Sequence, residues 1–184
     1  NTSSFQSDHK NEPDWIEKYG ILDLDGNPVV APHMRGWAER LHGCVNDTVF
    51  EEGYVAYFKR YIDAGADVMQ RDDPNTNFAA TNWGACFCGD CMIKFRNYLE
   101  VHSTPQEQKS WGIDTLQTFS YRDYLIARDA PVGDDFSKYD GGRLKELFVE
   151  FQKESTIAFH RRTRQAMNEY VGQSGAGEVY PLSC

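Results

Sequence analysis

The sequence predicts an α/β fold of the barrel type, because short apolar runs typical of buried strands alternate with longer segments of helical periodicity. Long polar loops follow the predicted strands at their carboxyl ends, where α/β barrels place their active sites. Three predicted strands cannot close an eight-stranded barrel, which typically needs about 250 residues. We therefore expect residues 1–184 to form a single, incomplete domain, part of a (β/α)8 TIM-type barrel whose long loops are stapled by a metal site.

Composition restricts the classes of partner. The 184 residues carry a formal net charge of −9, and 40% of them are hydrophobic, which is enough for a folded core. An acidic chain is a poor ligand for nucleic acid, because phosphate binding needs clustered Lys and Arg. No apolar run approaches the roughly 20 residues of a membrane span. We expect a soluble chain with no nucleic-acid or membrane partner; a cytoplasmic or exported location, and a homo-oligomer, are left open.

The strands are expected where β-branched and apolar residues cluster between turn residues. Residues 1–12 are polar, and we expect them to be flexible. The first predicted strand spans residues 29–34, the second residues 66–70, and the third begins at residue 178.

The helices are expected where apolar residues recur at helical spacing, or where a start signal stands in the sequence. Thr104, Pro105 and Glu107 form such a signal, with Pro in the first turn and Glu at the capping-box position. The predicted helices cover residues 50–64 and 91–99, a segment beginning at Thr104, and residues 121–128 and 142–171. The predicted long loops cover residues 35–48, 71–85 and 129–142.

Four cysteines carry the most specific chemical signal. Cys86, Cys88 and Cys91 stand in a C-x-C-x-x-C run, which places three thiols in one turn, and Cys44 lies in a distant loop. Zinc takes four such ligands in structural sites, at about 2.3 Å per Zn–S bond. The spacing therefore predicts a structural zinc site. Two alternatives remain open: disulfides, with Cys184 left unpaired, and an iron–sulfur cluster.

This layout resembles the barrel domain of glycoside hydrolase family 42 β-galactosidases and related hydrolases. The resemblance covers roughly residues 30–99 and includes an isolated Cys44, the run from Cys86 to Cys91, and the pairs Phe95-Arg96 and Tyr98-Leu99. The resemblance implies a zinc ion beside an active site, a carbohydrate substrate, and the zinc ligands Cys44, Cys86, Cys88 and Cys91.

The family's catalytic pattern is only partly present. Those enzymes carry an Asn-Glu pair at the strand end before the cysteine turn, and Glu is their acid/base. Here the strand ends in Gln70-Arg71-Asp72-Asp73-Pro74, so Asp72 and Asp73 become the candidates. Because adjacent strand residues point to opposite faces, only one of them would work with a distant second carboxylate. Asp73 is nearest the position of the missing Glu. Alternatively, one Asp pairs with an arginine and the other caps a loop.

The remaining candidates are side chains that suit a sugar. Amides hydrogen-bond to hydroxyl groups, and aromatic planes stack on sugar faces. Two sets flank the cysteines: His33, Arg35 and Trp37 after the first strand, and Asn77, Asn82 and Trp83 in the next loop. Packing within the loops and around the metal is the alternative role for both sets.

The function predicted from these observations is glycoside hydrolysis of a poly- or oligosaccharide by two carboxylates. The sequence contains neither a Gly-x-Ser-x-Gly elbow nor a Gly-rich phosphate loop, which disfavours a serine hydrolase and a nucleotide-binding enzyme. Two rival hypotheses remain: a non-catalytic glycan-binding domain derived from the same barrel, and a zinc-stabilised interaction domain with no role in sugar binding.

Overall fold

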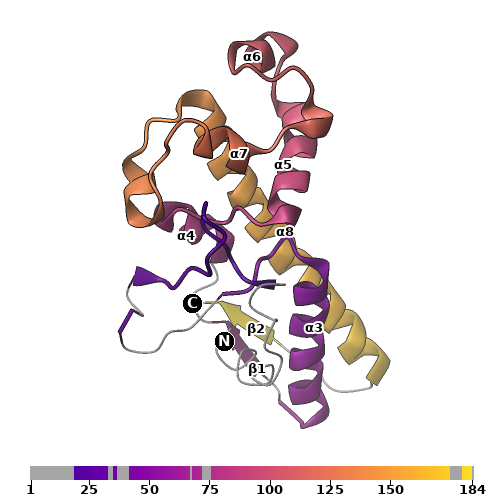
Figure 1. The fold of residues 1–184 in the computed structure, drawn as a ribbon. Coiled ribbons are helices and arrows are strands. Elements are labelled where there is room, and N and C mark those ends of the chain that lie inside the picture. The colour runs from indigo at the N-terminus through magenta and orange to yellow at the C-terminus, as the bar shows by residue number, and fades with distance from the viewer. Residues whose placement is uncertain are drawn as a thin grey trace.

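The computed structural model describes residues 19–32, 35–36, 42–66, 68–71, 76–174 and 180–183, and most of these are helical (Figure 1). The longer helices are α3 (Thr48–Asp63), α5 (Gly89–His102) and α8 (Gly142–Ser174). Shorter helical elements connect them: α4 (Thr76–Ala80), η2 (Thr81–Trp83), α6 (Pro105–Ser110), η3 (Leu116–Thr118), α7 (Tyr121–Ile126) and η4 (Gly133–Lys138).

A small parallel sheet lies at one end of the molecule. Strands β1 (Val68–Arg71) and β2 (Tyr180–Ser183) pair with Val68 opposite Tyr180 and Arg71 opposite Ser183. Parallel neighbours need a long crossover connection, and here the helices from α4 to α8 provide it. The predictions of strands near residues 66–70 and after residue 178 are therefore confirmed.

The expectation of an α/β barrel is wrong. Within the described ranges the only sheet is the pair β1 and β2, and the core is built by helices. Beside the first predicted strand, Leu22 and Pro28 make an isolated antiparallel bridge, and residues 29–32 belong to no strand of the sheet. Proline lacks the N–H that a central strand must donate, and Pro28 and Pro32 flank this run. The predicted loops also contain helical turns, α4 and η2 in one and η4 in another.

The predicted helices are confirmed, with small shifts at their ends. Helix α3 is capped by Asp47, whose carboxylate accepts from the Phe50 amide at 2.7 Å, and it ends before Gly65, which adopts φ +86°. Thr104 and Glu107 form the predicted capping box of α6. Helix α7 ends at Ile126, two residues earlier than expected.

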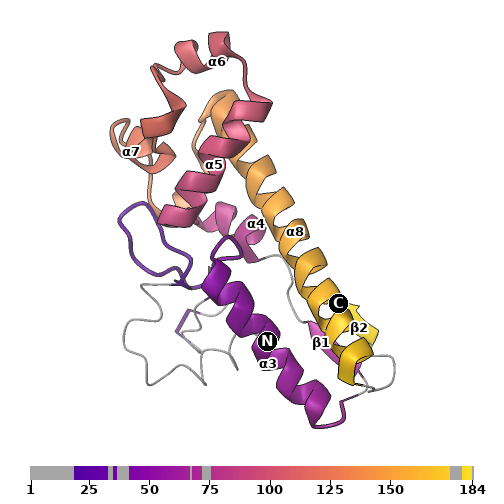
Figure 2. The same ribbon diagram turned by 90° about the vertical axis from the view of Figure 1, so that its right-hand side faces the viewer.

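Helix α8 is the element that the other helices share. It packs against α3, α4 and α5, and two views show that it runs the length of the molecule (Figures 1 and 2). Its apolar residues enter two separate clusters. Leu144, Phe148 and Phe151 join one around α5 and α7, and Phe159 and Met167 join the other along α3.

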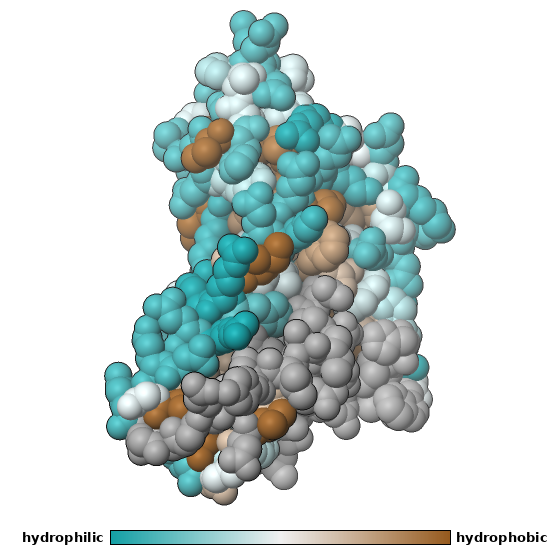
Figure 3. Space-filling model, turned by 180° about the vertical axis from the view of Figure 1, so that it is seen from behind, coloured by the Kyte–Doolittle hydropathy of each residue, from teal (hydrophilic) through white to brown (hydrophobic). Residues whose placement is uncertain are grey.

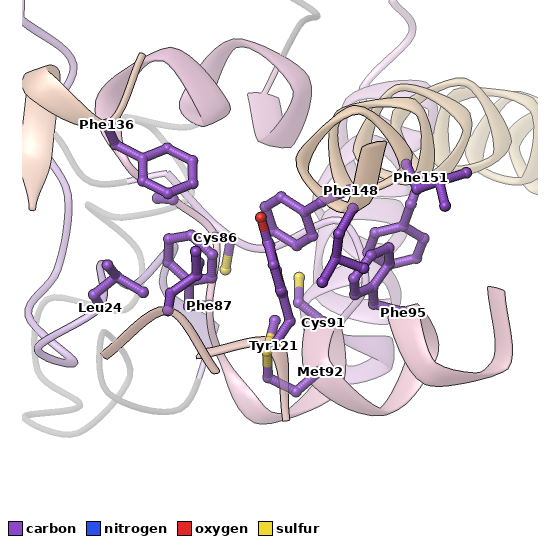
Figure 4. Close-up of a cluster of buried hydrophobic side chains, with 14 of the residues drawn as sticks. Leu24, Cys86, Phe87, Cys91, Met92, Phe95, Tyr121, Phe136, Phe148 and Phe151 are labelled. Atoms are coloured by element: carbon purple, nitrogen blue, oxygen red, sulfur yellow. The ribbon is translucent and has the colours of Figure 1, made fainter. Parts of the chain in front are cut away.

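The first cluster is an aromatic core centred on Phe148 (Figure 4). The Phe148 ring stacks on Phe87 with centroids 5.1 Å apart and lies 4.9 Å from Tyr121 and 5.1 Å from Phe95. Such pairs each add about 0.5–1.5 kcal/mol beyond the burial of their area. Cys44, Cys86 and Cys91 are buried in the same cluster, so the core and the cysteines share one environment.

The described surface is mainly polar. Seen from behind, hydrophilic side chains cover most of the face that is coloured, and apolar ones appear in small patches (Figure 3). Among the described helices, none combines the length and the apolar character needed to cross a membrane.

Replacing Phe148 should lower the free energy of unfolding sharply. Phe148 is fully buried, and truncating a buried Phe to Ala typically costs about 3–5 kcal/mol, because the transfer free energy is lost and a cavity remains. Val101, which is 79% exposed on α5, provides a control that should change stability by less than about 0.5 kcal/mol. Urea denaturation of Phe148→Ala and Val101→Ala measures both values. Equal midpoints for the two variants would show that Phe148 is not central to the core.

Candidate metal centre

Four cysteine side chains converge from two segments that lie far apart in the sequence. Cys44 precedes α3, Cys86 and Cys88 precede α5, and Cys91 lies in the first turn of α5. Their Sγ atoms all lie within 4.8 Å of one another. The Cys44 sulfur is 3.4 Å from that of Cys91 and 3.5 Å from that of Cys88. The four cysteines therefore lie close together and could hold a metal ion.

The Cys44 segment is held by backbone hydrogen bonds and by a close approach. The Cys44 amide donates to the Tyr19 carbonyl at 2.7 Å, and the Asp47 amide turns back to the Cys44 carbonyl at 3.0 Å. Gly43 lies directly against the ring of Phe50, which occupies the space that a Cβ would need. Only glycine therefore fits before Cys44.

The second segment turns sharply before its first cysteine. Gly84 adopts φ +73°, and a Cβ there would lie 2.7 Å from the Gly133 carbonyl oxygen. The Phe87 amide then donates to the Leu22 carbonyl at 2.8 Å. Phe87 itself is buried in the aromatic core, so its side chain anchors the middle of the cysteine turn.

The spacing of the sulfurs helps to choose between a single metal ion, disulfides and an iron–sulfur cluster. A disulfide would join two sulfurs at about 2.05 Å, whereas the closest pairs here are 3.4–3.5 Å apart, and all four cysteines are free. A single ion with four bonds of about 2.3 Å sets neighbouring sulfurs roughly 3.8 Å apart. An iron–sulfur cluster places several irons and sulfides between its thiolates and needs wider spacing. The geometry favours one ion.

Burial and mutual hydrogen bonding shift the pKa values of the thiols in different directions. Burial raises the pKa of the Cys44 and Cys86 thiols well above their ordinary value. Hydrogen bonds from Cys44 first, and then from Cys86 and Cys91, lower the pKa of Cys88, which is the only one of the four that is partly exposed. Burial therefore opposes ionisation of Cys44 and Cys86, whereas hydrogen bonding favours the thiolate form of Cys88.

Three buried carboxamides surround the sulfurs. Asn46 donates through Nδ2 to Cys91 at 3.3 Å, and Asn77 donates to Cys44 at 3.3 Å and to Cys91 at 3.5 Å. Gln152 on α8 also donates to Cys91, at 3.5 Å. Of these three, only Asn77 was a candidate from the sequence. It is buried beside the thiols, and its role in sugar binding stays a prediction.

The sequence also holds features that could have pointed to Gln152 and Asn46 as site residues. Gln152 is a polar residue on the apolar face of α8, four positions after Phe148, and a buried polar position of this kind needs a partner. Asn46 stands two positions after Cys44, and its backbone amide lies 3.4 Å from that sulfur.

The other predicted site residues do not belong to the group of four sulfurs and three amides or lie outside the described residues, although Trp83 packs against the hydrophobic cluster that contains Cys44, Cys86 and Cys91. Arg35 forms a bidentate ion pair with Asp134 at 2.7 and 2.8 Å. Trp83 is partly buried with its ring centroid 6.2 Å from that of His42, and Asn82 is exposed. The residues that fall outside the described ranges are His33, Trp37, Asp72 and Asp73.

Comparisons with known proteins add no assignment to this geometry. No family model matches the sequence, no curated protein matches it, and no solved structure matches the fold. The function is therefore argued from the residues of this chain. Among the described residues, the four sulfurs and the amides beside them are the group whose chemistry indicates a function.

Metal affinity should fall as the pH falls. A metal ion binds thiolates, and the raised pKa values of Cys44 and Cys86 mean that binding must displace their protons. The apparent affinity should drop roughly tenfold per pH unit for each proton displaced. Titration with cobalt(II) between pH 6 and 8, followed by thiolate-to-cobalt absorption, measures it. An affinity that stays constant over this range would mean that the thiols do not bind the ion.

Proposed function

We propose that Cys44, Cys86, Cys88 and Cys91 bind one zinc ion in a structural site. The observation that carries this proposal is the mutual approach of the four sulfurs within 4.8 Å in a mostly buried setting. Sulfur-rich tetrahedral sites select zinc among the common divalent ions. Four protein ligands leave no open position for water, which is the arrangement of a structural zinc site and not of a catalytic one.

The ion would join the turn before α3 to the first turn of α5. Cys44 leads into α3 through the turn at residues 44–47, and Cys91 opens α5. The two helices belong to different hydrophobic clusters, around Phe50 and around Phe95. A zinc ion between their first turns would therefore couple the two clusters.

The zinc site predicts one ion per chain and a stability that depends on it. Cys44→Ser should lose the ion and unfold at a lower temperature, because an incomplete shell leaves buried thiols unpaired. Structural zinc contributes on the order of 10 kcal/mol in small metal-dependent domains, and this larger chain, with its own core, should lose less. Elemental analysis and thermal unfolding of the purified protein measure both effects.

Cys184→Ser is the matched control, because it removes a thiol that is not one of the four proposed ligands. It should keep one zinc ion and the wild-type melting temperature. A wild-type protein that contains no metal, or that carries two disulfides among the four cysteines, would contradict the structural zinc site.

The second candidate function is hydrolysis of a poly- or oligosaccharide. One observation favours it over a purely structural protein: the cysteines that the family 42 resemblance marks as zinc ligands are the ones that converge. The candidate carboxylates Asp72 and Asp73 stand in the sequence directly after β1 and just before α4, whose Asn77 contacts the cluster. The resemblance implies an active site beside the metal. The position of Asp72 and Asp73 in the sequence, between β1 and α4, is consistent with that implication.

Separate Asp72→Asn and Asp73→Asn variants test the hydrolase. A general acid contributes roughly 10²–10⁴-fold in rate, so the catalytic variant, which we expect to be Asp73→Asn, should lose that factor on a glycan that the wild type cleaves. Asp114→Asn at an exposed site should retain full turnover. If both strand-end variants keep at least half of the wild-type turnover, the carboxylates are not catalytic. A glycan-binding or interaction domain then becomes the better hypothesis.

A further inference from the structure

The amides around the cysteines come from three different parts of the chain. Asn46 lies in the turn before α3, Asn77 in α4 and Gln152 in the middle of α8. All three side chains are buried, and Asn77 and Gln152 have no exposed surface. A buried carboxamide costs free energy unless its hydrogen bonds are made, so three of them at one point require an explanation.

The direction of each amide is fixed by groups that have only one hydrogen-bonding role. The Val45 backbone N–H can only donate, and it donates to Asn77 Oδ1 at 3.0 Å, so Asn77 Nδ2 faces the sulfurs. The Cys86 carbonyl can only accept, and it accepts from Gln152 Nε2 at 3.2 Å. Gln152 Oε1 then accepts from Asn77 at 3.0 Å and from Asn46 at 3.4 Å.

Three N–H groups are therefore aimed at sulfur, and Cys91 receives one from each of the three amides. Four thiolates around a divalent ion carry two excess negative charges, and Cys91 is fully buried. Hydrogen bonds to charged acceptors are the strong ones, and they offset the cost of burying that charge. Outside this shell, Lys94 donates to the backbone carbonyl oxygen of Asn46 at 2.6 Å, which adds a cation near the backbone of one shell residue.

We propose that Asn46, Asn77 and Gln152 form an amide shell whose N–H groups stabilise the excess negative charge of the metal centre. The shell thereby sets how tightly the ion is held. The inference rests on the proposed zinc site. The three amides are positioning residues that act through the cysteine sulfurs, chiefly that of Cys91. Gln152 is the key member, because it orients the other two amides and brings α8 to the centre.

Two substitutions at Gln152 separate charge compensation from packing. Gln152→Met keeps the length of the side chain but removes the N–H, and Gln152→Glu puts a carboxylate beside the thiolates. Loss of a partner of this kind typically lowers metal affinity about 10–100-fold. We expect zinc transfer to a chelator to be about tenfold faster in Gln152→Met and about 100-fold faster in Gln152→Glu. Gln165→Met, on the exposed face of the same helix, is the control and should match the wild type.

A spectroscopic readout distinguishes the shell from a structural role. In the cobalt(II) form, thiolates that lose an N–H donor become more electron-rich, so the thiolate-to-cobalt band should move to lower energy in Gln152→Met. A packing defect alone would not move this band. Wild-type release rates and an unshifted band in both Gln152 variants, with zinc still bound, would overturn the amide shell and leave the zinc site standing. A wild type that binds no metal would overturn both.

A measurement on the wild-type chain covers the case in which the variants do not fold. In the cadmium-113 form, an N–H···S–Cd hydrogen bond transmits scalar coupling from the metal to the amide proton. We expect such couplings at the side-chain amides of Asn46, Asn77 and Gln152, and none at Gln165. Cadmium bound without any coupling to these three amides would contradict the shell.

Discussion

The convergence of four cysteine sulfurs at one point, three of them buried and that of Cys88 partly exposed, is the constraint on which the rest of the described structure depends. Thiolates repel one another and are costly to bury, so a site of this kind needs a cation at its centre and hydrogen-bond donors around it. The described residues are arranged to meet both requirements. The sulfurs are close enough to share one ion, and buried amides point their N–H groups at them.

This constraint explains why α8 is long and why it contains a buried glutamine. The helix passes from the aromatic core around Phe148 to the second cluster around Phe159, and Gln152 lies between the two. Packing on both sides fixes the helix, and the helix fixes the glutamine against Cys91 and the Cys86 carbonyl. The candidate metal centre thus lies where the two clusters meet, with Cys44 in one and Val45 in the other.

Much of the secondary structure and the cysteine cluster follow from local patterns. The spacing of Phe50, Tyr54 and Phe58 predicts α3, and the C-x-C-x-x-C run predicts that three thiols lie together, because both depend on neighbours in the sequence. The barrel prediction fails for the opposite reason. Whether an apolar run pairs as a strand is decided by distant partners, and beside the first predicted strand Pro28 pairs with Leu22 in an isolated bridge instead of entering a sheet. Gln152 was missed because its role depends on residues 61 and more positions away.

X-ray absorption at the zinc edge of the purified protein tests the central claim most directly, because it reports the ion, its ligand atoms and their distances together. Four sulfur neighbours at about 2.3 Å, with no lighter atom in the shell, are the result expected for Cys44, Cys86, Cys88 and Cys91 around one closed site. Nitrogen or oxygen ligands at about 2.0–2.1 Å, or no zinc at all, would contradict the account.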